Sequence, residues 1–238
     1  MNTGDLKELK VIAGGSITAL LHELAPRFEK SNGHRLSIHF DSTPNIIARM
    51  TSGTPFDALV VPSDVLRDSG AKALLATSPV ADIARVGYGL IVRAGAAKPD
   101  ISTPSALKKA LLSANSVAFL PSSAAGSYVT KMFEQLGIAE EMRAKTKVQS
   151  GPTQIAPAVA SGEAELGVFL TNVLIAPGVE FVGPFPPPLQ QELTFVAAIA
   201  ADTQKADAAR RLVEFLMTPT AFAAIKANGM TPGKLHTD

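Results

Sequence analysis

The chain has 238 residues, enough for one large domain or two small ones, and with 46% hydrophobic residues it can bury a core rather than remain disordered. Its 22 Lys and Arg nearly balance 21 Asp and Glu, and aromatic residues make up only 5%, which argues against a nucleic-acid partner. The absence of cysteine excludes disulfides, thiolate nucleophiles and cysteine-based metal sites.

The N-terminal segment Met1–Glu8 has neither the basic start nor the long apolar run of an export signal. As written, the sequence predicts a cytoplasmic protein, or a periplasmic one if a signal peptide has been removed. The closest approach to a membrane-spanning run is Phe195–Ala201, far shorter than the roughly 18 apolar residues required. We therefore expect no membrane insertion.

Short apolar runs alternate with segments of helical periodicity, which predicts an α/β fold with mostly parallel strands. The runs predicted as strands are 9–13, 36–40, 58–61, 89–92, 116–120, 147–149, 166–169, 179–182 and 194–199.

Helices are predicted between these strands. Apolar residues between Ile17 and Phe28 recur at helical spacing. Thr103-Pro104 and Thr218-Pro219 each provide an N-cap residue followed by a proline at the first helical position. Another helix is predicted from about Ser127, with a glycine cap at Gly137.

Two connections divide the predicted elements into lobes. The segment Gly183–Pro188 is proline-rich, so we expect an extended connection there rather than a helix or a central strand. A second connection is expected near residues 81–89. The simplest arrangement is one lobe formed by residues 1–83 and 191–238 and a second lobe formed by residues 84–190.

Four polar turns follow predicted strands and combine small hydroxyl residues with Gly, Ala or Pro: Gly14–Thr18, Asp41–Pro44, Pro121–Ser127 and Ser150–Thr153. Backbone N–H groups and helix dipoles at such turns favour anions, and open α/β sheets bind ligands at the carboxyl ends of their strands. An N-cap role is the alternative for any single turn. Because two turns fall in each lobe, we favour a cleft between the lobes that captures a small oxyanion or carboxylate, without a metal or cofactor.

Six stretches spanning nearly the whole chain are similar to one known group of proteins: Val11–Ser16, Phe28–His34, Ser42–Arg49, Gly53–Ala58, Ser161–Gly167 and Phe215–Pro219. They resemble the type 2 periplasmic-binding-protein superfamily, in particular the periplasmic molybdate-binding proteins of ABC transporters. The resemblance implies two α/β lobes, hinge closure over an anion in the cleft between them, and an ABC permease as partner.

The polar turns and the resemblance together indicate the candidate ligand-binding residues: Gly15, Ser16, Ser42, Thr43, Ser123, Ala124, Ala125, Gly126, Thr153 and Thr171. Ser16 and Ser123 are expected to face each other across the cleft. The family has a tyrosine after the position of Gly167, where this chain has none and Thr171 is the nearby hydroxyl. A tetrahedral oxyanion would lose one hydrogen bond, which disfavours molybdate and tungstate.

Further stretches resemble the branch of the superfamily that includes aconitate isomerase: Lys98–Ile101, Ser122–Tyr128, Gly178–Pro184 and Gly229–Pro232. This resemblance implies an enzyme that moves a proton within an unsaturated tricarboxylate. Such a shift needs a base beside an acidic C–H and donors for the carboxylate that gains enolate character. Asp41 is the first candidate base, because strand alternation puts it on one face with Ser37 and His39 and it stands at the strand mouth. Capping of the next helix is its alternative role.

Other polar residues are weaker candidates. Tyr128 and Glu192 are alternative bases, and Arg85 could pair with a substrate carboxylate. His39 in a strand is more typical of an interior group than of a base. His34 and His236 are too isolated to bind a metal. Two hypotheses therefore stand, a binding protein for a small oxyanion or organic acid and an isomerase that uses the same cleft.

Overall fold

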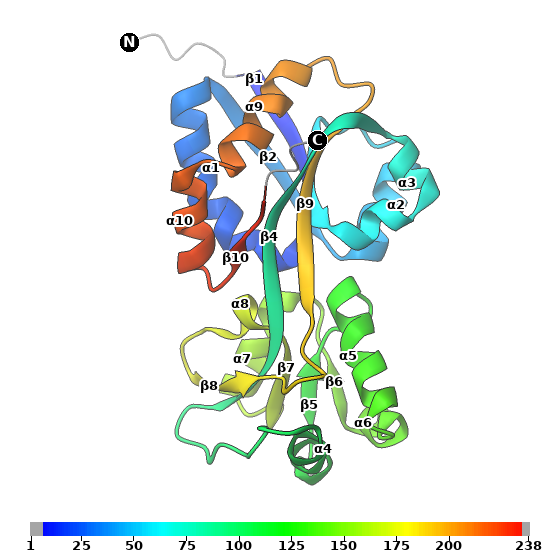
Figure 1. Cartoon of the computed structure of the whole chain (residues 1–238), viewed down its shortest axis with the longest axis vertical. Coiled ribbons are helices and arrows are strands. Elements are labelled where there is room, and N and C mark those ends of the chain that lie inside the picture. The colour runs from blue at the N-terminus through cyan, green and yellow to red at the C-terminus, as the bar shows by residue number, and fades with distance from the viewer. Residues whose placement is uncertain (1–6, 235–238) are drawn as a thin grey trace. The chain divides into compact units, whose positions relative to one another are not determined.

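The computed structural model describes residues 7–234, and within this range the side chains of residues 78 and 79 are not described. The chain divides into two compact units (Figure 1). Unit 1 comprises Met1–Arg85 and Thr194–Asp238, and unit 2 comprises Val86–Leu193. The sequence placed these divisions at 83/84 and 190/191.

The elements of unit 1 are β1 (Lys7–Gly14), the 3-10 helix η1 (Gly15–Ile17), α1 (Thr18–Asn32), β2 (His34–Asp41), α2 (Thr43–Thr51), β3 (Ala58–Pro62), the 3-10 helix η2 (Ser63–Arg67), α3 (Ser69–Ala73), α9 (Ala206–Leu216), α10 (Pro219–Ala227) and β10 (Thr231–Pro232). The elements of unit 2 are α4 (Pro104–Ser113), β5 (Val117–Phe119), α5 (Ala124–Gln135), α6 (Ala139–Lys145), β6 (Thr146–Val148), the 3-10 helix η3 (Pro152–Gln154), α7 (Ile155–Ala160), β7 (Leu166–Leu170), α8 (Thr171–Leu174) and β8 (Val179–Pro184). Two strands, β4 (Leu75–Arg93) and β9 (Glu192–Ala200), run through the divisions between the units. Every run predicted as a strand overlaps an observed strand.

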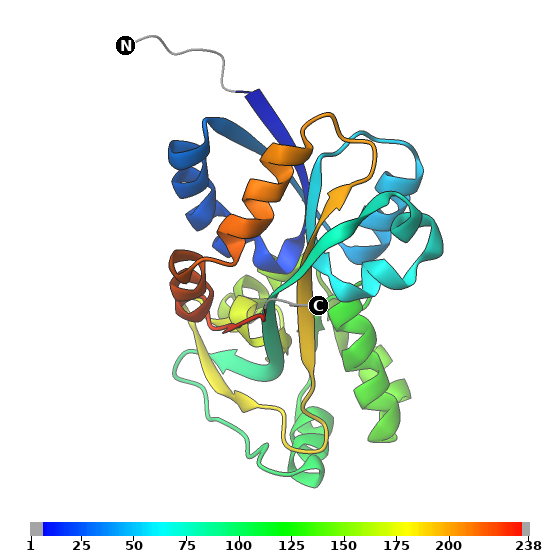
Figure 2. The ribbon, with the colours of Figure 1, turned by 45° about the horizontal axis from the view of Figure 1, so that its top comes forward.

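Unit 1 is built on a sheet with three parallel strands in the order β2-β1-β3, and β9 pairs antiparallel with β3. All five residues of β3 are buried, as expected of a continuous apolar run inside a covered sheet. Helices α1, α9 and α10 lie on one side of these strands and α2 and α3 on the other (Figures 1 and 2). The α2 side encloses a core that includes Ile12, Ile46 and Leu59.

Helix α1 shows how sequence periodicity sets the packing of unit 1. Leu20, Leu21, Leu24 and Phe28 are all buried, which is the apolar stripe of an amphipathic helix. The helix ends at Asn32, and its C-cap Gly33 adopts the left-handed conformation with φ +65°, which glycine does without a steric cost.

Unit 2 has a second sheet in which β7 pairs antiparallel with β4 and parallel with β5, while β6 pairs parallel with β5. The side chain of Thr103 caps α4, and that of Thr218 caps α10 in unit 1, as their Thr-Pro motifs predicted. Helix α5 begins at Ala124 rather than near Ser127. Its C-cap is Leu136, and the predicted cap Gly137 follows with φ +66°.

The largest departure from the sequence-based expectation is β4. Residues 81–89 were expected to form a connection, but they lie within a strand of 19 residues. Polar residues and two glycines interrupt the apolar pattern there, yet the strand is paired by β10 near Arg85 and by β7 from Tyr88 onward. A β-carbon on Gly89 would lie 2.8 Å from the backbone oxygen of Gly183 in the paired strand β8, so strand packing requires this glycine. Gly183 and Pro184, expected in a connection, end β8.

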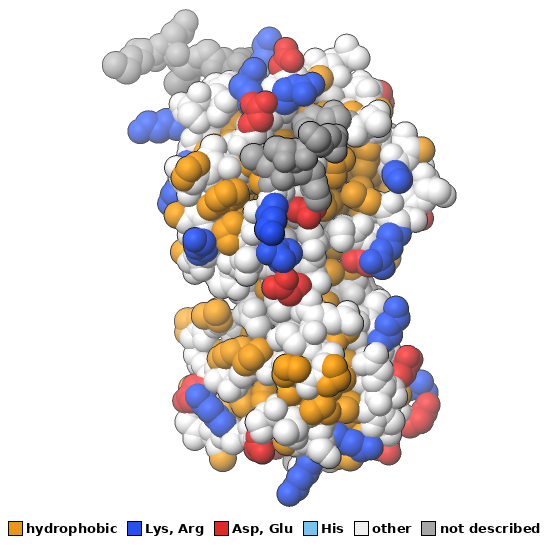
Figure 3. Space-filling model, viewed as in Figure 1, with side chains coloured by type: hydrophobic (Ala, Val, Ile, Leu, Met, Phe, Trp, Pro, Cys, Tyr) orange, Lys and Arg blue, Asp and Glu red, His pale blue; other side chains and the backbone are white. Residues whose placement is uncertain are grey.

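No helix among residues 7–234 is long and apolar enough to cross a membrane. On the face of the molecule drawn in Figure 3, basic and acidic side chains are interspersed.

Candidate functional site

The carboxyl ends of β1 and β2 bring two of the predicted turns together in unit 1. The strands are parallel neighbours, and their register pairs Gly14 with Asp41. The turn that contains Gly15 and Ser16 therefore begins beside the turn that contains Ser42 and Thr43. We call these four residues the first seat.

The helix that leaves the first seat begins without a capping side chain. Neither η1 nor α1, which follow one another directly, has a side-chain hydrogen bond at its N-cap. The Thr18 hydroxyl is directed back to the Gly15 carbonyl, to which it donates over 2.8 Å. Ser16 is half-buried at this start. Backbone N–H groups of a first helical turn need an acceptor from outside the helix, and an anion meets this requirement.

Asp41 lies beside the first seat and its two carboxylate oxygens differ. Oδ1 accepts hydrogen bonds from the backbone N–H of Ser42, at 2.7 Å, and from Asn45 Nδ2, at 2.8 Å. Oδ2 lies 3.5 Å from His39 Nε2, and this buried nitrogen has no hydrogen-bond partner among the residues described. The N-cap of α2 is Ser42, whose side chain makes no capping bond. Asp41 thus holds the turn through the Ser42 N–H, and its Oδ2 makes no hydrogen bond to the residues described.

In unit 2 the carboxyl ends of three adjacent parallel strands carry the other candidate residues. β7 is followed by Thr171, β5 by Ser123–Gly126, and β6 by the turn with Thr153. Because the strands are parallel, these turns share one edge of the sheet. We call this group, Ser123–Gly126 with Thr153 and Thr171, the second seat.

The start of α5 uses part of the second seat for its own structure. The Ser123 hydroxyl accepts from the Gly126 N–H at 2.9 Å and donates to the Leu120 carbonyl at 3.0 Å. Its donor capacity is therefore used within the turn, so the donors left for a ligand are the N–H groups of Ala124 and Ala125. A β-carbon on Gly126 would lie 1.7 Å from the Leu120 oxygen, which makes glycine obligatory.

Thr153 and Thr171 stand on short elements. Thr153 is exposed in η3, which has no side-chain cap, and Thr171 is half-buried at the start of α8. Before this turn, the amide of buried Gln149 donates to the Lys147 carbonyl and to Glu163, both at 3.2 Å. Both threonines follow strands that end at the same edge of the sheet as the Ser123 turn.

Both tyrosines of the chain meet beside the second seat, a feature that the sequence did not reveal. Tyr88 of β4 is in register with Leu170, and its ring centre lies 4.5 Å from that of Tyr128 on α5. The Tyr128 hydroxyl donates to the Leu189 carbonyl, and burial raises the pKa of its phenol above the ordinary value of 10.0. Tyr88 was not among the candidates because residues 81–89 were expected to form a connection rather than part of a strand.

The remaining candidates belong to separate elements. Nδ1 of His34 lies 2.9 Å from the Asn32 carbonyl, Arg85 is half-buried opposite Thr231, and Glu192 is exposed at the start of β9. His236 lies outside the described residues. Within residues 7–234, no group of three or more His, Asp or Glu is arranged to hold a metal.

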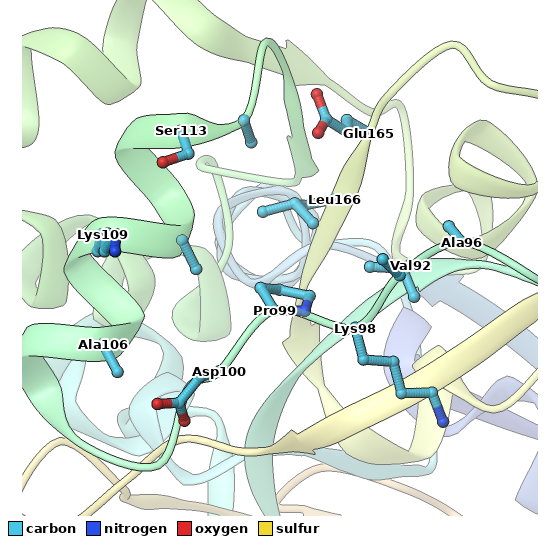
Figure 4. A pocket seen from close by; sticks show the side chains of 13 residues that line it. Val92, Ala96, Lys98, Pro99, Asp100, Ala106, Lys109, Ser113, Glu165 and Leu166 are labelled. Atoms are coloured by element: carbon cyan, nitrogen blue, oxygen red, sulfur yellow. The ribbon is translucent and has the colours of Figure 1, made fainter.

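A cavity of about 560 Å³ lies at the other end of the unit 2 sheet (Figure 4). It is lined near its centre by Pro99 and Leu166, and by residues of α4 along one side. Lys98 extends away from these residues to pair with Glu180 at 3.1 Å. Because Leu166 begins β7 and Thr171 follows its end, this cavity is separate from the second seat.

Comparison with known proteins identifies the family. Residues 9–231 match the family described as bacterial extracellular solute-binding protein. The chain belongs to this family. It is 31% identical to an aconitate isomerase from Pseudomonas over 231 residues, covering 94% of this chain and 87% of that protein. It is also 25% identical to the molybdate-binding protein ModA of Azotobacter vinelandii over 225 residues, covering 93% and 89% of the two chains.

The solved structures agree on the fold. The periplasmic molybdate-binding protein of Azotobacter vinelandii superposes with a TM-score of 0.77 at 22% identity, and the match covers 95% of this chain and 100% of that protein. The α/β class and the two-lobe periplasmic-binding-protein fold predicted from the sequence are thereby confirmed, as is the resemblance to the molybdate-binding group. The expected cytoplasmic location is not supported, because the matching family is described as extracellular.

Proposed function

We propose that this solute-binding protein captures a small anion, an organic carboxylate or an oxyanion, with the first seat of unit 1 and the second seat of unit 2 as its candidate binding turns. Two features of unit 1 support the proposal. The start of η1 and α1 has no capping side chain, and it lies beside a second polar turn at the same edge of the sheet. Family membership supports the same function. A periplasmic location and delivery to an ABC permease complete the proposal.

The chemistry of the two seats favours an anion without any lysine or arginine. The donors are backbone N–H groups of helix starts and small hydroxyls, contributed by Gly15, Ser16, Thr43, Ala124 and Ala125. Hydrogen bonds from such donors to a charged acceptor are stronger than neutral ones, and the helix dipole adds a favourable field. Neutral donors therefore suffice to bind a carboxylate.

Titration calorimetry with citrate, cis-aconitate, trans-aconitate, sulfate and molybdate tests the receptor function. The Ser16→Ala variant should bind the preferred anion roughly ten- to hundredfold more weakly, because it loses a hydrogen bond to a charged group worth about 1.5–3 kcal/mol. The matched control is Ser105→Ala, at an exposed position near the start of α4. Unchanged affinity in Ser16→Ala with a lowered melting temperature would assign Ser16 to the helix alone.

A second candidate function is isomerisation of an unsaturated organic acid. The 31% identity to an aconitate isomerase over nearly the whole chain favours it, together with Asp41 Oδ2, which accepts no hydrogen bond from residues 7–234. In such a reaction Asp41 would take a proton from an allylic carbon, the carbon–carbon double bond would shift, and a proton would be returned to the distal carbon. Donors of the seats would stabilise the enolate-like carboxylate.

Turnover distinguishes the two functions. Incubation with cis-aconitate, followed by chromatography with ultraviolet detection, should show trans-aconitate if the chain is an isomerase. The Asp41→Asn variant should then lose at least about a hundredfold in rate, the usual size of a general-base contribution. Tight binding of cis-aconitate without turnover in the parent protein would exclude this reaction and leave the receptor.

A further inference from the structure

Asp41 introduces a negative charge at the edge of a seat proposed to bind anions. Its side chain is 29% exposed, and within residues 7–234 no Lys or Arg forms an ion pair with it. The basic group that faces it is His39, at a distance of 3.5 Å between Nε2 and Oδ2. This exceeds the usual range of about 2.7–3.2 Å for a hydrogen bond. Among residues 7–234, Oδ2 therefore has no hydrogen-bond donor, and it can accept one from a ligand.

The location of Asp41 within unit 1 follows from strand alternation. Phe40 points to the α1 side of the sheet, where its ring packs against His22 at 5.2 Å. His39 and Asp41 therefore lie on the α2 side, and Asp41 is linked there to Asn45 of α2. Because Gly14 is its neighbour in β1, no side chain of that strand stands between Asp41 and the beginning of the first seat.

An anion that carries no hydrogen-bond donor fits this arrangement poorly. Sulfate or molybdate, fully ionised, would meet the Asp41 carboxylate with like charge and would leave Oδ2 without a donor. A ligand that carries a hydroxyl or ammonium group next to its anionic group would donate to Oδ2 while the seat holds its charge. The same acceptor then becomes a source of selectivity.

We propose that Asp41 is a specificity-determining residue that restricts the ligand to small carboxylates bearing a hydrogen-bond donor on the adjacent carbon, of the hydroxy-acid or amino-acid class. This rests on the proposed anion-binding function. Fully ionised oxyanions are disfavoured by the same carboxylate.

Three ligands that differ at one carbon test the proposal. Succinate has no donor at C2, malate has a hydroxyl, and aspartate has an ammonium group. Calorimetry on the parent protein should give at least about tenfold tighter binding of malate or of aspartate than of succinate, which is the effect of one well-placed charge-assisted hydrogen bond. The tighter of the two identifies which donor the site accepts.

Two variants test whether Asp41 is responsible. In Asp41→Asn the preference over succinate should shrink to within about threefold, because the carboxylate is replaced by a neutral amide of the same shape. Asp64→Asn removes a carboxylate near the end of β3 that is already paired with Arg67 at 3.1 Å, and it should retain the preference. Thermal melts of both variants establish that they are folded.

The outcomes separate this proposal from the receptor function. Equal binding of all three ligands by the parent, or a preference that persists in Asp41→Asn, overturns the role of Asp41 and leaves the receptor intact. Binding of sulfate or molybdate together with no binding of malate or aspartate also overturns it. Failure of every anion tested to bind overturns both proposals.

Discussion

Gly126 shows how a single residue sets the geometry of the second seat. Helix α5 begins so close to the end of β5 that the Leu120 carbonyl occupies the space of a β-carbon. The same closeness lets Ser123 bridge the turn through the Leu120 carbonyl and the Gly126 N–H. The N–H groups of Ala124 and Ala125 are held at the sheet edge as a result.

Gly126→Ala is expected to destabilise the protein by more than about 3 kcal/mol, because a contact of 1.7 Å to a backbone oxygen is relieved only by moving α5. Urea unfolding followed by circular dichroism measures the loss. The control is Gly151→Ala, where no atom lies within 4 Å of the new β-carbon and a change within about 0.5 kcal/mol is expected. Equal stability of the two variants would contradict this account of α5.

At the scale of elements, the segment after β8 is attached to β4 and α5 by a small set of contacts. The side-chain amide of Gln190 accepts from the Tyr88 N–H at 2.9 Å and donates to the Tyr88 carbonyl at 2.8 Å. It thus imitates a strand partner for this residue of β4. Leu189 accepts from Tyr128 of α5, and the ring of Phe185 stacks on Tyr88 at 6.1 Å. Helix α5 is therefore tied to β4 through a loop.

Gln190→Ala should cost about 2–3 kcal/mol of unfolding free energy, because it removes both hydrogen bonds and leaves the buried Tyr88 N–H without its acceptor. The neighbouring Gln191→Ala changes an exposed side chain and should be nearly neutral. Hydrogen exchange offers a second measurement, since the Tyr88 amide should exchange faster in Gln190→Ala. Unaltered exchange at Tyr88 would argue against the bidentate contact.

At the scale of the whole chain, Asp57 joins segments that are distant in sequence within unit 1. Its carboxylate accepts from the Lys10 N–H at 2.8 Å, the Thr203 hydroxyl at 2.6 Å and the Lys205 ammonium at 3.1 Å, which are 47, 146 and 148 positions away. Burial opposes ionisation, but these three donors outweigh it and lower the pKa of Asp57 below its ordinary value of 3.8. Asp57 therefore links the N-terminal and C-terminal segments of unit 1.

The lowered pKa predicts how stability depends on pH. The unfolded chain binds a proton to Asp57 more readily than the folded one, so this contribution is present above the unfolded pKa near 3.8 and is lost as pH falls through the lower folded pKa. Asp57→Asn should cost about 2–3 kcal/mol at pH 7. Urea titrations should show the difference from the parent shrinking below about pH 4. A difference independent of pH would contradict the ionised contact.

The sequence by itself determined the α/β class, the position of the predicted strands and the two Thr-Pro helix starts. These features depend on local chemistry, namely the period of apolar residues and the capping of a first helical turn. It also placed the candidate residues at strand ends, because a polar turn after an apolar run is visible without knowing its neighbours. Ser16 and Ser42 were identified in this way.

Only the tertiary structure decided which of these groups have donors and acceptors left for a ligand. The Ser123 hydroxyl is used within its own turn, Tyr88 is brought to Tyr128 by β4, and Asp41 Oδ2 faces His39 without a hydrogen bond. The strand at residues 81–89 likewise depends on partners more than 70 positions away, such as Leu170 for Tyr88. Local periodicity carries no record of such pairings, because their energy comes from contacts between segments that the folded chain alone brings together.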